Sequence, residues 1–188
     1  LNVRAHKIMR AKIVIFLIII STSVCAEIEK VALPGDNGFQ FYWWPKLVPF
    51  KEWHHDRDAS LHYQVNAMVP DGSTFGDAET VIYGKAIYKA REPELKSLDM
   101  LIERDRDDFL VNIPDISINE SEPILISDGT KLQSFTFFPQ SKGNWEKVAY
   151  CEDGDYYLVF TISSRSEKGY RAAKQAYEKM VESYTSEP

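Results

Sequence analysis

The chain has 188 residues, with 22 Lys and Arg against 28 Asp and Glu and a formal net charge of −6. A negatively charged surface repels phosphate backbones, so nucleic acid is excluded as an expected partner, and anionic membrane surfaces are disfavoured for the same reason. The length suits a single domain with a full hydrophobic core.

The first predicted element is a secretory signal peptide over residues 1–26. Arg10 and Lys12 form a short basic region, residues 13–20 are an unbroken apolar run, and the small residues that end at Ala26 fit a cleavage site. An apolar run of this length is too short for a membrane-spanning helix, which needs about 20 residues. We therefore expect export to the periplasm or the medium, without stable membrane insertion after cleavage.

Cleavage would leave residues 27–188 as a single domain with a net charge of about −10, because the removed segment contains basic residues and no acidic ones. A lipoprotein anchored at Cys25 is the alternative, although the residue before it, Val24, is branched where such signals prefer a small one. The mature chain keeps one cysteine, Cys151, which cannot form an internal disulfide. Acidic residues follow it, so we expect a buried apolar thiol and not a reactive one.

Three strands are predicted in the first half of the mature chain. Residues 39–44 (FQFYWW) form the first, which Pro45 ends. Residues 61–69 alternate between apolar and polar side chains, as a half-buried strand does, and a loop rich in turn-forming residues follows. Residues 80–88 (TVIYGKAIY) form the third strand.

A helix is predicted next, within residues 97–110 and with Ser97 as its N-cap. Asp105 interrupts the apolar stripe of this helix, so the edge of the stripe should be partly exposed to solvent. The stripe consists of Leu98, Leu101, Ile102 and Phe109.

The second half of the chain predicts four consecutive strands and a terminal helix. Asp-Gly pairs at 128–129 and 153–154 indicate hairpin turns between apolar runs. The predicted strands are 123–127, 131–138, 146–151 and 156–163. A capping box, Ser164 with Glu167, predicts the start of the helix. Its apolar face should cover the sheet through Tyr170, Ala173, Tyr177, Met180, Val181 and Tyr184.

These elements predict the α+β class, with one mainly antiparallel sheet and two packed helices. The aromatic opening strand GFQFYWWP, the helix SLDMLIERDRDDF, the strands around the Asp-Gly turns and the closing helix follow the order of a known fold. Over residues 37–185 the chain resembles the PsbP-like fold of PsbP, the Ran-binding release factor and DcrB-type lipoproteins. The resemblance implies an α/β/α sandwich and a binding or accessory role, and it transfers no catalytic residue. Residues 45–60 are longer than that fold requires.

The segment FKEWHHDRD contains the candidate metal ligands, His54 and His55 with two aspartates, and His62 follows. Imidazole and carboxylate groups together suit zinc or a similar divalent ion. Adjacent residues of an extended chain point to opposite sides, so His54 and His55 do not easily share an ion. A turn through residues 56–60 would be needed to bring His62 back. We therefore favour no metal site and expect no cofactor.

The early segment also gathers large aromatic residues, among them Trp43, Trp44 and Trp53. Trp43 and Trp44 should point to opposite sides of their strand, so one of them is expected to be less buried. An exposed aromatic ring near acidic residues suits a protein partner or a small ligand.

The sequence thus predicts an exported, non-enzymatic accessory or binding protein whose partner surface includes Trp43, Trp44, Trp53, His54, His55 and His62. One alternative is a metal-dependent hydrolase or metal-binding protein that uses His54, His55 and His62. Another is a periplasmic inhibitor or immunity-type protein whose acidic surface blocks a basic partner.

Overall fold

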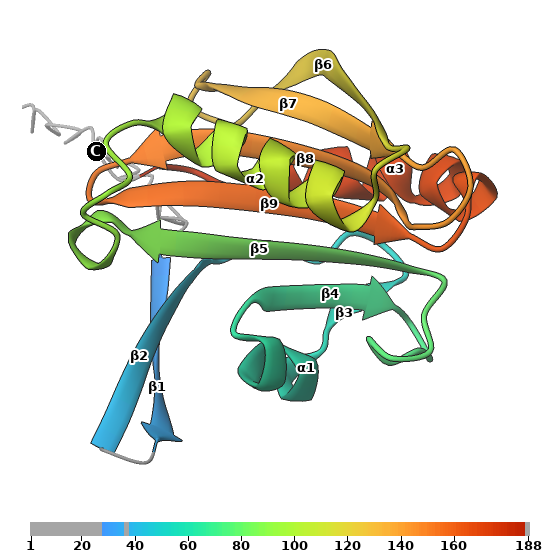
Figure 1. Ribbon diagram of the computed structural model, residues 1–188. Coiled ribbons are helices and arrows are strands. Elements are labelled where there is room, and N and C mark those ends of the chain that lie inside the picture. The colour runs from blue at the N-terminus through green and yellow to red at the C-terminus, as the bar shows by residue number, and fades with distance from the viewer. Residues whose placement is uncertain (1–27, 36–37, 187–188) are drawn as a thin grey trace, which may run out of the picture.

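A computed structural model describes residues 28–35 and 38–186, so the predicted signal peptide and Cys25 lie outside the described residues (Figure 1). The described chain is α+β. Its strands are β1 (Ile28–Gly35), β2 (Gly38–Pro45), β3 (Trp53–His55), β4 (Asn66–Pro70), β5 (Thr80–Tyr88), β6 (Ser117–Leu125), β7 (Lys131–Phe138), β8 (Trp145–Asp153) and β9 (Tyr156–Ser164). Its helices are α1 (Arg57–Tyr63), the 3-10 turn η1 (Lys89–Arg91), α2 (Leu98–Asn112) and α3 (Glu167–Glu182).

The strands form one antiparallel sheet in the order β1-β2-β5-β9-β8-β7-β6, and the short strands β3 and β4 extend it beside β5. The four consecutive strands predicted in the second half are therefore confirmed as neighbours. β9 lies in the middle and pairs along its whole length with β5 on one side and β8 on the other. Side chains paired across an antiparallel ladder share a face, so this register determines what each face of the sheet presents.

Helix α3 covers one face of the sheet (Figure 1). The predicted apolar face of this helix is confirmed, since all six of its residues are buried. They pack against Leu158, Phe160 and Ile162 of β9, which are buried on that side. The Tyr177 hydroxyl donates a hydrogen bond of 2.9 Å to the Phe160 carbonyl oxygen, so even the polar atom of this buried ring has a partner.

Helix α2 covers the opposite face, which completes an α/β/α sandwich. Ser97 is its N-cap, as predicted, and accepts a hydrogen bond from the Met100 amide. Leu101 and Ile102 are buried against the apolar side chains of β7, β8 and β9, and Phe109 stacks on Phe137 with ring centroids 4.1 Å apart.

The hairpin of β1 and β2 projects from the edge of the sheet as an arm (Figure 1). A single registered pair, Trp43 with Ala86, joins it to β5. Only the second strand of the arm was predicted, because residues 28–35 lack a clear alternation of apolar and polar side chains. Gly38 begins β2 with a φ of 117°, a conformation that favours glycine.

The prediction of one strand over residues 61–69 is wrong in its first half. Residues 61–63 end helix α1, Gln64 adopts a left-handed conformation that terminates the helix, and β4 begins only at Asn66. Asp56 explains the helix, because its side chain caps the first turn by accepting a hydrogen bond from the Ala59 amide. A helix of two turns is too short for its periodicity to stand out against strand-like alternation.

Two further boundaries differ from prediction. The N-cap of α3 is Ser166 and not Ser164, which is the last residue of β9 and hydrogen bonds to Thr80. A side chain at Gly169, in the first turn of α3, would place its Cβ 2.5 Å from the Ser164 Oγ, so the helix sits directly on the sheet here.

β6 also begins six residues before the expected strand at 123, because an edge strand tolerates polar residues on both sides.

Cys151 is buried under α3, as predicted. Desolvation raises the pKa of its thiol to about 12, and the neighbouring Asp153 adds to this effect, so the thiol stays protonated at neutral pH. None of the helices in the described part of the chain is long and apolar enough to cross a membrane.

Candidate functional site

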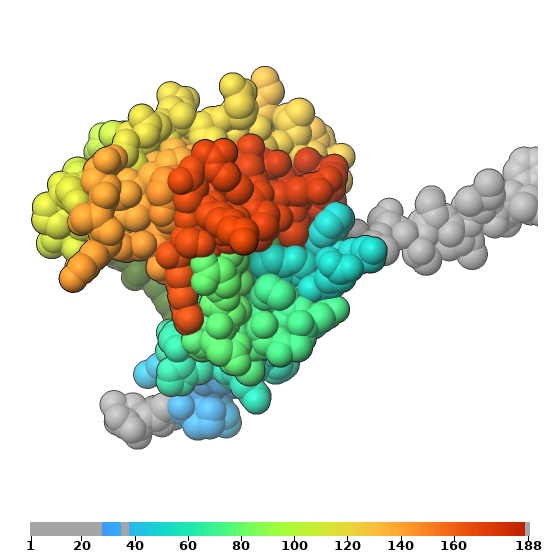
Figure 2. Space-filling model, turned by 90° about the vertical axis from the view of Figure 1, so that its right-hand side faces the viewer, coloured from blue at the N-terminus to red at the C-terminus, as the bar shows by residue number. Residues whose placement is uncertain are grey.

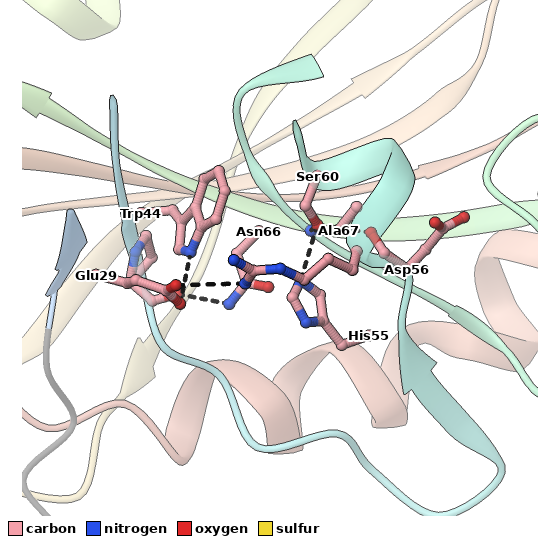
Figure 3. Close-up of polar contacts among 9 residues, drawn as sticks. Glu29, Trp44, His55, Asp56, Ser60, Asn66 and Ala67 are labelled. Atoms are coloured by element: carbon pink, nitrogen blue, oxygen red, sulfur yellow. Dashed lines mark hydrogen bonds and ion pairs between the residues drawn. The ribbon is translucent and has the colours of Figure 1, made fainter. Parts of the chain in front are cut away.

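The three predicted histidines have separate partners in the structure. His54 Nδ1 lies 3.4 Å from an Asp71 carboxylate oxygen at the surface. His55 Nε2 lies 2.8 Å from the Ser60 Oγ (Figure 3). His62 is exposed in the last turn of α1, edge-on to the ring of Tyr63. The turn through α1 therefore does not fold His62 back into a shared ligand set with the other two.

His55 and Ser60 do not form a nucleophile and base. Ser60 is fully buried, and its one hydroxyl proton goes to the Asp56 carbonyl oxygen at 2.7 Å. Its oxygen also accepts from the Ala67 amide, so His55 Nε2 must be the donor in the contact between them (Figure 3). Burial lowers the pKa of His55, which favours this neutral Nε2–H form. The arrangement holds α1 against β4.

The carboxylate of Asp56 is also committed to the fold. One oxygen accepts the Ala59 amide at 3.0 Å and the other accepts the Phe75 amide at 2.9 Å, and these bonds lower the pKa of Asp56. The residue therefore joins the start of α1 to the loop before β5. Within residues 28–35 and 38–186, no group of three or more His, Cys, Asp and Glu side chains is placed to hold a metal ion.

The predicted tryptophans lie in three different environments. Trp44 is 0% exposed, and its indole nitrogen donates to Glu29 at 3.1 Å, so it belongs to the interior (Figure 3). Trp53 is half-buried and packs on the core beneath α3. Trp43 is half-buried at the base of the arm, where Arg91 lies over its ring. As predicted, Trp43 and Trp44 differ in exposure, and Trp43 lines a cavity.

A cavity that the sequence did not predict lies beside β5, on the side of the sheet that α2 only partly covers. It has two adjoining parts, of about 370 Å³ and 420 Å³, which share Tyr63, Val65 and Tyr83 as lining residues. We call the two parts together the β5 hollow. Its volume is in the range of small-molecule sites, which is about 300–1,000 Å³. In Figure 2 the β5 hollow is seen in profile, between the orange residues near 140 and the teal residues near 60.

Aromatic rings from three separate segments line the smaller part of the β5 hollow. Tyr63 comes from α1, Phe75 from the loop after β4, and Tyr83 from β5. The ring centroids of Tyr63 and Phe75 are 4.8 Å apart, and those of Phe75 and Tyr83 are 6.2 Å apart. Tyr63 is 52% exposed, so this wall is available to a ligand.

The same part contains a hydrogen-bonded series of polar side chains from β8, from β9 and from Asn144, the residue before β8. The Asn144 amide donates to the Ser163 Oγ at 2.9 Å, and the Ser163 hydroxyl donates to the Glu146 carboxylate at 2.6 Å. Glu146 as a residue is half-buried, but its carboxyl group is enclosed by protein, and desolvation raises its pKa to about 7. This carboxyl therefore changes charge near neutral pH.

A second carboxyl with a raised pKa lies further along the same face. Burial raises the pKa of Asp105 on α2, while Lys85 opposes that shift. The Tyr150 hydroxyl donates to Asp105 at 3.3 Å, and burial raises the pKa of Tyr150 in turn. This polar contact therefore lies between α2 and the sheet, beside the apolar cluster that α2 covers.

The arrangement around Ser163 suits binding better than nucleophilic catalysis. Ser163 lies within the central strand and pairs with both Val81 and Glu146, so the backbone around it is engaged in the sheet. An oxyanion hole needs free donors aimed at the developing charge, usually at a turn or a helix N-terminus. Among the described residues no histidine lines the hollow.

Comparison of the sequence with models of protein families and with curated proteins found no match. The β5 hollow therefore has to be interpreted from its own geometry. Sequence reasoning missed Tyr63, Tyr83, Glu146 and Ser163, because they come from four distant segments. One signal was present: Glu146 occupies an inward position of a strand, two residues before Val148, where an acidic side chain is unusual.

Proposed function

We propose that this chain is an exported, non-enzymatic accessory protein with a PsbP-like fold that binds a ligand in the β5 hollow. The observation that carries the proposal is the aromatic wall of Tyr63, Phe75 and Tyr83 over a cavity of small-molecule size. Ligand sites are mostly apolar and aromatic, with few polar groups that orient the bound molecule. The hollow has such an aromatic wall together with a larger share of polar groups, among them Asn144, Glu146 and Ser163.

The position of the hollow supports the same function. Its outer wall is built by α1 and by the loop after β4, which pack on the sheet through small clusters around Val65 and Ala78. The opposite wall is the rigid ladder of β5, β9 and β8. A preformed cavity between a rigid sheet and a small lobe loses little entropy when a ligand binds.

The proposal is tested by a fragment screen followed by NMR on protein purified from an exporting host, whose intact mass also reports whether residues 1–26 are removed. Amide shifts of binding fragments should cluster at residues that line the hollow. Tyr63→Ala should abolish these shifts, while Phe39→Ala is the matched control. Phe39 is 71% exposed at the tip of the arm, so this control removes an aromatic ring outside the hollow. Shifts that cluster elsewhere, or that survive Tyr63→Ala, would contradict the proposal.

A further inference from the structure

Glu146 is an acidic group without a cationic partner. Among the residues that the structure describes, Ser163 is its one hydrogen-bonding neighbour, and no Lys or Arg forms an ion pair with it. An enclosed carboxylate with a single hydrogen bond is costly, because desolvation is not offset by an opposite charge. A positively charged ligand would supply that charge.

The aromatic wall also favours a positively charged ligand. The faces of aromatic rings carry negative electrostatic potential, and they attract cations that lie within about 6 Å of the ring centroid. Tyr63, Phe75 and Tyr83 bring three rings to the cavity that also contains Glu146. Rings grouped beside a carboxylate form the kind of site that recognises ammonium groups.

We propose that the smaller part of the β5 hollow binds a small organic cation, with its ammonium group between the aromatic wall and Glu146. The inference rests on the proposed function, since it names the class of ligand for the same site. The acidic balance of the chain as a whole, with 28 acidic against 22 basic residues, favours the approach of a cation.

The other charged and titratable groups around this part do not neutralise Glu146. Arg165 lies at the exposed rim, where its guanidinium donates to the Gly76 carbonyl oxygen at 2.6 Å. Glu79 adds a second acidic group and accepts a hydrogen bond from Ser166. The hydroxyl groups of Tyr63 and Tyr83 complete the set, and burial together with Glu146 raises the pKa of Tyr83, which keeps it neutral.

Protons should therefore compete with the ligand for Glu146. The carboxyl has a pKa of about 7 without ligand, so it is charged at pH 8 and largely neutral at pH 5.5. The affinity for a cation should be lower at pH 5.5 than at pH 8, by about tenfold or more for a pKa near 7. A neutral ligand of the same shape should show no such change.

The test is calorimetric titration with choline and with its uncharged isostere, 3,3-dimethylbutan-1-ol. We expect choline to bind at least tenfold more tightly than the isostere at pH 8, and Glu146→Gln to reduce this difference to the part that the aromatic rings supply. Glu152→Gln is the matched control, because Glu152 lies on the same strand and face but outside the hollow. This control should bind choline as the unmodified chain does. The pH comparison uses the unmodified chain and needs no variant.

Three outcomes would overturn the inference, and they are distinguishable. Equal binding of choline and the isostere, lost in Tyr63→Ala, would show a ligand site that does not select for charge; the proposed function would then stand without the cation. No binding of either compound, together with no fragment shifts at the hollow, would remove the proposed function as well. Choline binding that is unchanged by both Glu146→Gln and pH would also refute the role of this carboxyl.

Discussion

The two faces of strand β9 differ in chemistry along their length. Beneath α3, Leu158, Phe160 and Ile162 are all apolar and fully buried. On the other face, Val159 lies under α2, but Thr161 and Ser163 follow toward the end of the strand, where the β5 hollow opens. Both faces belong to the same strand, so backbone propensity cannot be the reason for the difference.

The helix that covers each face explains the contrast. α3 runs across β9, β8 and β5 and leaves no room for an unsatisfied polar group, whereas α2 packs chiefly on the β7 and β8 side of the sheet. Where helix cover ends, polar side chains become tolerable because they can reach solvent, a ligand or one another. A sheet can therefore carry a core on one face and a site on the other.

The largest effect should come from truncating a residue on the covered face. We expect Phe160→Ala to lower the free energy of unfolding by about 3–5 kcal/mol, because the substitution creates a cavity beneath α3 that the surrounding side chains cannot fill. The neighbouring Thr161→Val, on the opposite face, should cost about 1 kcal/mol, as for one lost hydrogen-bonding group. Urea unfolding measures both. Similar losses for the two variants would contradict the contrast between the faces.

A smaller effect of opposite sign is expected at Glu146. Its pKa is raised from 4.5 to about 7 in the folded chain, so the folded state binds the proton more tightly than the unfolded state between these values. Stability should accordingly fall as the pH rises from about 4.5 through 7.

Glu146→Gln should flatten this dependence and increase stability at pH 8 by about 1–3 kcal/mol. Urea unfolding at pH 5 and pH 8 checks the prediction, with Glu152→Gln as the control that removes an exposed carboxylate from the same strand. If both variants retain the pH dependence of the unmodified chain, Glu146 is not the group responsible.

The smallest effect concerns Lys147, a charged residue buried on the face under α3. Its ammonium lies 3.5 Å from Glu178 and 3.3 Å from the Glu122 carbonyl oxygen, and burial lowers its pKa. Lys147→Met should leave stability unchanged or raise it, because an apolar residue avoids the desolvation cost.

Removing the partner charge should have the reverse effect. Glu178→Gln should cost about 1 kcal/mol, since it leaves the Lys147 ammonium with weaker compensation. Glu167→Gln, which breaks an exposed pair with Arg171 on the same helix, should cost no more than about 0.5 kcal/mol. Thermal unfolding of the three variants ranks their stabilities. A destabilised Lys147→Met would show that the buried pair of Lys147 and Glu178 stabilises the fold.

The sequence predicted the parts of the fold that have strong local signals. The apolar face of α3 has a regular helical period, the Asp-Gly turns mark the hairpins, and Ser97 marks the start of α2. The arm and α1 escaped prediction because their stability comes from distant contacts. Trp44 bonds to Glu29 across the hairpin, and Asp56 bonds to Phe75 across a loop.

The candidate site was harder to predict for the same reason. Clustering of His54, His55 and His62 along the chain suggested a site, yet the structure gives each a different partner. The residues of the β5 hollow, such as Tyr63 and Glu146, are more than 80 positions apart and meet only through the sheet register. Spacing along the sequence predicts that two side chains lie close together only when both residues belong to one helix or strand.

The close seating of α3 on the sheet has a consequence for sequence variation. Any side chain at position 169 would meet Ser164, Glu79 and Thr80 at 2.9 Å or less, and Glu79 also lines the β5 hollow. Substitutions here would push the helix and the rim of the hollow apart together. In a set of diverged descendants of this gene, glycine should therefore persist at position 169 while the exposed positions of the same helix vary.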